Sequence, residues 1–211
     1  MGLRDIRTLT ALAVIGLSGW SICCGWTIVR FSLASTKATS HEERARAVRP
    51  WIGAPGVAAA AMEASLTDAA GPTDADTIRT RSEEFEALLT RRPMSSLGWL
   101  SLASMRLVSE QPVDRILGAL TLSSLTGANE GRAMSQRGIF ALWQWESMPV
   151  DVRKRLAADL AASMLERAMS SPEQTTAYEI LAVKSADTRR EIADLLRADG
   201  LSADDLRRIG L

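Results

Sequence analysis

Apolar side chains recur at helical spacing along most of this chain. In the clearest segment, residues 150–165, Val152, Leu156 and Leu160 occupy every fourth position, which places them on one face of a helix. Turn and capping residues separate such segments, and none shows the sustained alternation of a strand. Residues 171–174, Ser-Pro-Glu-Gln, are predicted to form a capping box with proline at the first helical position. We therefore predict an all-α fold with helices that begin near Ser95 or Ser96, Pro112, Asn129, Pro149, Ser171, Asp187 and Ser202.

The longest apolar element is N-terminal. Residues 8–29 contain no charged side chain, and a helix of that length spans roughly 33 Å, close to the hydrocarbon thickness of a bilayer. We predict a transmembrane helix, because the apolar region of a cleaved signal peptide is shorter, about 7–15 residues. Cleavage stays open as an alternative, since residues 32–34, Ser-Leu-Ala, have the small side chains of a cleavage site.

The orientation of this helix depends on the charges that flank it. Arg4 and Arg7 precede the apolar run and Arg30 and Lys37 follow it, so the balance of positive charge is nearly even. The short N-terminal tail resembles that of an uncleaved signal anchor, which stays in the cytoplasm. We therefore expect a single-pass protein of a bacterial inner membrane with a periplasmic C-terminal domain.

Shorter helices are expected between the anchor and the main domain. Residues 41–48 are charged and compatible with a helix, residues 50–56 break it with proline and glycine, and residues 57–66 form an alanine-rich helix that ends at Gly71-Pro72. The predicted organisation is an anchor at 1–34, a tether with short helices at 35–76 and a helical domain at 77–211.

The short connections within residues 77–211 are typical of antiparallel helical hairpins, as in tetratricopeptide (TPR) repeats. Trp99, Leu102 and Ala103 match the first signature positions of such a repeat. Arg106 and Arg115 stand where an aromatic and a small residue are usual, so only part of one repeat is supported. A TPR-like array and an irregular helical bundle both remain open.

Composition narrows the chemistry. The formal net charge is zero, which argues against nucleic acid as the main partner. The two cysteines, Cys23 and Cys24, both lie in the apolar run, and His41 is the single histidine, so neither a zinc site nor a histidine-dependent catalytic site is expected. We expect no metal, no cofactor and no enzymatic activity.

A family resemblance rests on three short stretches: residues 92–100 (Arg-Pro-Met-Ser-Ser-Leu-Gly-Trp-Leu), residues 125–131 (Leu-Thr-Gly-Ala-Asn-Glu-Gly) and residues 134–137 (Met-Ser-Gln-Arg). They resemble small membrane-anchored helical proteins of bacterial exopolysaccharide clusters, sometimes called the VpsP-like group. The resemblance covers roughly residues 85–155. It implies an accessory role in polysaccharide synthesis or export at the inner membrane, with envelope or polysaccharide-assembly proteins as partners.

Polar and aromatic residues are most concentrated between Gly127 and Trp145. Tryptophan can anchor a partner protein or stack on a sugar. Trp143 follows Phe140 by three residues and therefore shares its helical face. We expect Trp143 to be packed and Trp145 to be exposed. The predicted partner-binding residues are Asn129, Glu130, Arg132, Arg137, Trp143 and Trp145.

A second hypothesis is a carbohydrate-binding or glycan-cleaving domain. Glu146-Ser147 resembles the glutamate-serine pair of lysozyme-like lytic transglycosylases, in which a carboxylic acid protonates the glycosidic oxygen. The glycine-rich signature that follows in those enzymes is missing here. We therefore favour a non-enzymatic scaffold anchored in the membrane.

Overall fold

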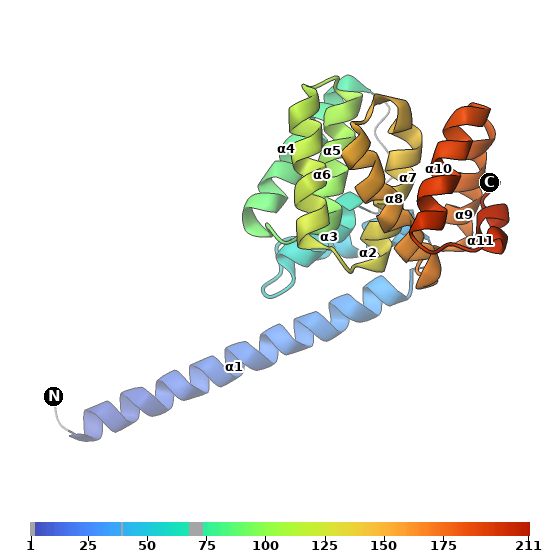
Figure 1. Ribbon diagram of the computed structural model, residues 1–211. Coiled ribbons are helices and arrows are strands. Elements are labelled where there is room, and N and C mark those ends of the chain that lie inside the picture. The colour runs from blue at the N-terminus through green and yellow to red at the C-terminus, as the bar shows by residue number, and fades with distance from the viewer. Residues whose placement is uncertain (1–2, 39, 68–73) are drawn as a thin grey trace. The chain divides into compact units, whose positions relative to one another are not determined.

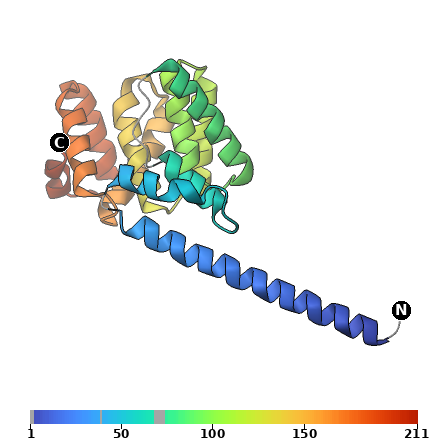
Figure 2. The ribbon, with the colours of Figure 1, turned by 180° about the vertical axis from the view of Figure 1, so that it is seen from behind.

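The computed structural model describes residues 3–38, 40–67 and 74–211, and at residues 3–11, 41 and 42 it describes the backbone alone. Within these ranges the chain forms eleven α-helices and two short 3-10 helices and contains no strand, which confirms the predicted all-α class (Figures 1 and 2). The chain divides into two compact units, Met1–Pro93 and Met94–Leu211. The predicted boundaries after residues 34 and 76 both lie within the first unit, and the division after Pro93 was not predicted.

Helix α1 (Leu3–Thr36) is the apolar N-terminal element. Within its stretch Leu12–Thr36, a window of 18 residues has a mean hydropathy of 1.7 and none of it is buried, so the helix is long and apolar enough to cross a membrane. The predicted helix is confirmed, and it continues beyond Val29 because residues 30–36 contain no proline or glycine to end it.

The first unit continues with α2 (His41–Val48), the 3-10 helix η1 (Arg49–Trp51), α3 (Ala58–Thr67) and α4 (Ala75–Arg91). Ser40 and Asp74 begin α2 and α4 in extended conformations, and their side chains accept hydrogen bonds from the amides of Glu43 and Thr77. The predicted helices at 41–48 and 57–66 are confirmed. The predicted stop at Gly71-Pro72 lies outside the described residues, as does the side chain of His41.

The second unit opens with two helical hairpins. Helix α5 (Ser96–Val108) packs along α6 (Val113–Thr126), and α7 (Gly131–Gln144) packs along α8 (Val150–Leu165). Side-chain and proline caps begin three of them as expected: Ser95 accepts from the amide of Gly98 at 3.0 Å, while Pro112 and Pro149 precede α6 and α8. Within the first hairpin, the Arg106 guanidinium donates a hydrogen bond to the Arg115 carbonyl at 3.0 Å.

Helices α9 (Ser171–Ala182), α10 (Ala186–Ala198) and α11 (Ala203–Arg208) complete the second unit. The capping box of α9 is formed by Ser170 with Glu173, one residue earlier than predicted, because Ser170 is extended and its amide donates to the Glu173 carboxylate at 2.8 Å. Helix α10 likewise begins one residue before Asp187, after the cap Ser185. The predicted box of Ser202 with Asp205 is confirmed.

One continuous hydrophobic core holds the second unit together. Its largest fully buried members come from five of these helices and the turn after α7: Leu120, Leu142, Trp145, Leu156, Leu160, Leu181, Ile192 and Leu196. Helices α7 and α8 approach each other closely at Gly138, where an added Cβ would lie 2.6 Å from the Leu160 Cβ. The fold thus presents α7 as a central helix that contacts α8 and α9 and also reaches α5.

Candidate functional site

An open groove of about 350 Å³ lies on the second unit, where α5, α7 and the first turn of α9 meet. Its lining combines aromatic, aliphatic and polar side chains: Leu100, Ser101, Ser104, Gln136, Ile139, Phe140, Trp143 and Glu173. A cavity of this size with convergent polar groups is the usual form of a ligand or partner site.

Helix α7 supplies half of the lining through its periodicity. Gln136, Phe140 and Trp143 follow one another at intervals of four and three residues, so they share one helical face. The opposite face carries Met134 and Ala141, which are buried in the core. Since the helix is apolar on two sides, one apolar face packs inward while the other borders the groove.

Trp143 is the dominant exposed group of this groove. Its side chain is 62% exposed at the C-terminal end of α7. The prediction that it shares a face with Phe140 is confirmed, because both line the groove. The prediction that this face is packed and that Trp145 is exposed was wrong.

Trp145 is only 1% exposed. Helix α7 ends at Gln144 and the chain enters a 3-10 helix, η2 (Trp145–Ser147), so the spacing of an α-helix no longer sets the direction of the indole. The indole Nε1 donates to Glu191 at 3.1 Å, and the Arg153 guanidinium lies 5.8 Å from the ring centre. Trp145 is therefore a core residue with a satisfied polar edge, not a contact surface.

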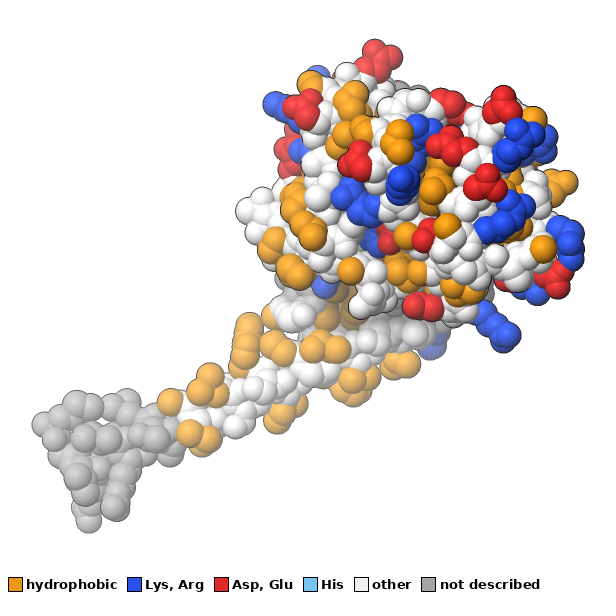
Figure 3. All heavy atoms as spheres, in the orientation of Figure 1, with side chains coloured by type: hydrophobic (Ala, Val, Ile, Leu, Met, Phe, Trp, Pro, Cys, Tyr) orange, Lys and Arg blue, Asp and Glu red, His pale blue; other side chains and the backbone are white. Residues whose placement is uncertain are grey.

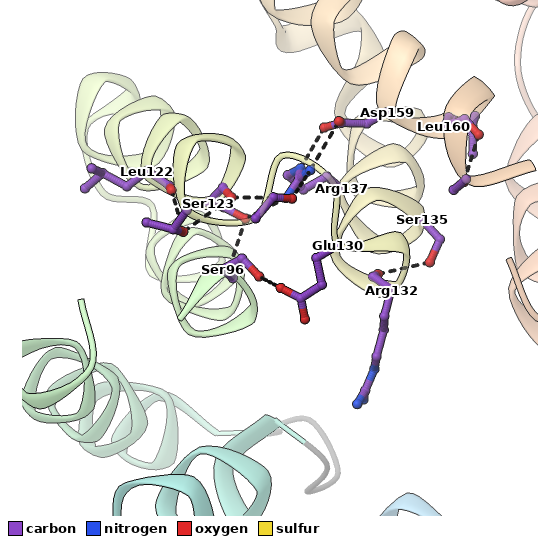
Figure 4. Close-up of polar contacts among 12 residues, drawn as sticks. Ser96, Leu122, Ser123, Glu130, Arg132, Ser135, Arg137, Asp159 and Leu160 are labelled. Carbon is purple, nitrogen blue, oxygen red and sulfur yellow. Dashed lines mark hydrogen bonds and ion pairs between the residues drawn. The ribbon is translucent and has the colours of Figure 1, made fainter. Parts of the chain in front are cut away.

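Arg137 is fully buried and forms the centre of a polar network between helices (Figure 4). Its Nε and Nη2 donate to the Asp159 carboxylate at 2.6 and 3.2 Å. Its Nη1 donates to the Ser123 carbonyl and its Nη2 to the Gly127 carbonyl, both at 3.1 Å. This arginine joins α7 to α8 and to the end of α6, and it is inaccessible to a partner.

The remaining predicted residues lie at the other end of α7. Glu130, not Asn129, is the residue before the helix, and its carboxylate accepts a hydrogen bond from the Ser96 hydroxyl (Figure 4). Asn129 is exposed and Arg132 is half-buried. A helix rises 1.5 Å per residue, so this end is roughly 18 Å from Trp143. The six residues predicted as one surface are therefore dispersed.

The polar groups of the groove were not predicted as site residues. The Ser101 hydroxyl and the Gln136 amide have no hydrogen-bond partner among the described residues, whereas Ser104 bonds to the Leu100 carbonyl of its own helix. Glu173 accepts from Ser135 at 3.0 Å as well as from Ser170. The seven-residue spacing from Gln136 to Trp143 could have revealed one of these residues, while the approach of α5 to α7 leaves no trace in the sequence.

Glu146 does not line the groove but forms an ion pair with Lys184, whose ammonium also donates to the Trp143 carbonyl at 3.3 Å. The Lys184 ammonium, 2.6 Å away, donates a hydrogen bond to this carboxylate and lowers its pKa below the ordinary value. A general acid for glycoside cleavage needs the opposite shift, a raised pKa that keeps the proton at neutral pH. The electrostatics of Glu146 do not match the role assigned to it in the glycan-cleaving hypothesis.

Charge over the molecule is mixed rather than segregated. Acidic and basic side chains are interspersed on the face seen in Figure 3, while hydrophobic side chains predominate along the described part of α1. Within the described part of the chain, no cluster of three or more His, Cys, Asp or Glu side chains could hold a metal ion. The groove beside Trp143 is therefore the candidate site on the second unit.

No family model, no curated protein and no solved structure matches this chain in the comparisons. The groove and α1 are therefore the features of the molecule that bear on its function.

Proposed function

We propose that this protein is a non-enzymatic, membrane-anchored accessory protein that binds a partner in the groove between α5 and α7. The observation that supports this most directly is Trp143, 62% exposed beside an open groove. Leaving an indole in water forgoes the favourable burial of a large apolar surface. Tryptophan is also among the residues that contribute most to binding when a partner covers them.

Helix α1 supports a membrane setting for this function. This helix anchors the protein in a bacterial inner membrane, the short tail with Arg4 and Arg7 stays in the cytoplasm, and the helical units are exported. Envelope proteins are then the accessible partners. The resemblance to the VpsP-like group favours polysaccharide-assembly proteins among them.

A second candidate function is glycan binding without cleavage. Sugars stack on exposed indoles and hydrogen-bond to neighbouring hydroxyl and amide groups. Trp143 offers such a face, and Ser101 and Gln136 offer uncommitted polar groups in the same groove. Glu146 plays no part in this version, because its carboxylate is paired with Lys184.

Crosslinking from the groove tests the proposal in the full chain. The photoreactive amino acid p-benzoylphenylalanine replaces Trp143 in one variant and Val183, which is 84% exposed at the end of α9, in a control. After irradiation of cells we expect one defined crosslinked product from position 143 and none of the same size from position 183. Equal products from both positions, or none from either, would contradict the binding of a protein in this groove.

Affinity measurements then separate the two candidate partners. Once the crosslinked protein is known, Trp143→Ala should weaken its binding roughly 30-fold, the effect of losing about 2 kcal/mol at a binding hot spot. Val183→Ala should leave binding unchanged. If the full chain in detergent instead binds purified envelope glycan through Trp143 and no protein product forms, glycan binding replaces protein binding as the function.

A further inference from the structure

An uncharged turn in the first unit lies directly against α1. No charged side chain occurs from Pro50 to Met62. The Trp51 ring lies under the Arg30 guanidinium, whose carbon is 5.7 Å from the ring centre. A few residues later, Gly56 approaches Cys24 so closely that a Cβ added to Gly56 would lie 3.5 Å from the Cys24 Cβ. Residues 50–57, here named the apolar turn, therefore follow α1 from Arg30 back towards Cys24.

The positions of Arg30 and Cys24 along α1 indicate how deep in the membrane the apolar turn would lie. Arg30 is the first charged residue after the apolar run and belongs at the lipid headgroups. Cys24 precedes it by six residues, which corresponds to about 9 Å along a helix. Segments that lie in the membrane interface reach about 5–10 Å into the boundary between headgroups and acyl chains. The apolar turn thus spans the depth of that layer.

The side chains of the turn suit this layer. Ile52 and Pro55 are exposed, and Trp51 is half-buried with its indole paired to a cation. Tryptophan is enriched at membrane interfaces because its ring is apolar and its N–H is polar. On α1, exposed apolar side chains continue on both sides of Arg30, with Trp26 64% and Leu33 54% exposed. Helix α1 and the apolar turn together expose an apolar surface, and the contact of this surface with water is unfavourable.

Part of the backbone of the turn does not need water as a hydrogen-bond partner. Pro50 and Pro55 have no N–H group to satisfy. The amides of Ile52, Ala54 and Val57 donate to the carbonyls of Arg49, Trp51 and Ala54, at 3.3, 2.9 and 3.4 Å. These bonds reduce the penalty for exposing polar backbone groups to lipid.

We infer that the apolar turn is a second membrane contact, which inserts into the headgroup and upper acyl layer of the leaflet where α1 emerges. The inference rests on the proposed anchoring by α1. The partner of this surface is lipid, because the surface is uncharged and continuous with the span. The first unit is then held to the bilayer at two points, the helix and the turn.

Fluorescence quenching in vesicles tests the inference with the full chain. The background carries Cys23→Ser and Cys24→Ser, and one cysteine for an NBD label is introduced by Ile52→Cys, Ile15→Cys or Val183→Cys. Ile15 lies in the span, and Val183 is an exposed position of the second unit. Each protein is reconstituted into phosphatidylcholine–phosphatidylglycerol vesicles. The quenchers are iodide on both sides of the membrane and lipids with nitroxides at shallow or deep acyl positions.

We expect a several-fold loss of iodide quenching at position 52 relative to position 183, together with stronger quenching by the shallow nitroxide than by the deep one. Position 15 should respond most to the deep nitroxide. If position 52 is as open to iodide as position 183 while position 15 is shielded, α1 is inserted and the inference about the turn is overturned. If position 15 is also open to iodide, the anchoring proposal itself fails.

Discussion

At the scale of single residues, two side chains of α7 lie in environments opposite to those that their polarity favours. The charged Arg137 is fully buried, whereas the aromatic Trp143 is 62% exposed. Sequence spacing groups Trp143 with Phe140 correctly, but it cannot tell which apolar face of the helix is inward. Arg137 is buried because Asp159, 22 residues further along the chain, neutralises it, and no local pattern reports that pairing.

Replacing Arg137 with methionine should destabilise the second unit. The change removes both guanidinium hydrogen bonds to the Asp159 carboxylate, and the carbonyls of Ser123 and Gly127 each lose one of their donors. Removing one partner of a buried ion pair costs about 3–5 kcal/mol. Urea unfolding of the full chain in detergent, followed by circular dichroism, measures the loss.

The matched control is Arg155→Met on α8, at an exposed arginine. Its effect should stay within about 0.5 kcal/mol, as for other surface substitutions. If the two variants unfold at similar urea concentrations, the network around Arg137 contributes little to the stability of the second unit.

At the scale of elements, helix ends are predictable where their caps are local. Ser95, Pro112, Pro149 and Ser202 were identified from the sequence because each cap acts within four residues of the helix start. The shift of the α9 box by one residue arises because Ser170 and Ser171 are adjacent and chemically equivalent. The groove was not predictable in the same way, since it depends on the packing of α5 beside α7.

The contact between α7 and α8 gives a second stability prediction. Gly138→Ala would place a methyl group 2.6 Å from the Leu160 Cβ. We expect overpacking to cost about 1–3 kcal/mol, more than the gain of up to about 1 kcal/mol that alanine brings to a helix interior. Thermal unfolding measures the sign.

Gly118→Ala on α6 is the control for this comparison. No heavy atom outside its own helix and chain neighbours lies within 4 Å of a Cβ added there. The variant should therefore gain about 0.5–1 kcal/mol from helix propensity alone. If Gly138→Ala is stabilised as well as Gly118→Ala, helices α7 and α8 can move apart without a loss of stability.

At the scale of the whole molecule, the sequence predicted the class of fold and the single apolar helix, because both depend on composition and periodicity. It did not predict the division between Pro93 and Met94, which depends on contacts between residues distant in the chain. The direction of insertion is a separate question, since flanking arginines occur on both sides of the apolar run.

Labelling of whole cells tests the proposed direction of insertion. In the Cys23→Ser and Cys24→Ser background, Val183→Cys should react with a maleimide that enters the periplasm but does not cross the inner membrane. The expected reason is export of the helical units by a signal anchor whose tail stays inside. A cysteine introduced at Gly2 serves as the cytoplasmic control, and reaction at position 183 only after lysis would place the helical units in the cytoplasm.

The two cysteines of the chain are both within α1, so the second unit contains no thiol. Folding of the second unit consequently requires no oxidant and suffers no wrong pairing of sulfurs, in the periplasm or in the cytoplasm. A variant inverted by moving arginines from the tail to the far end of α1 should therefore yield the same folded second unit on the opposite side of the membrane. Comparing the two topologies separates loss of access to a partner from loss of structure.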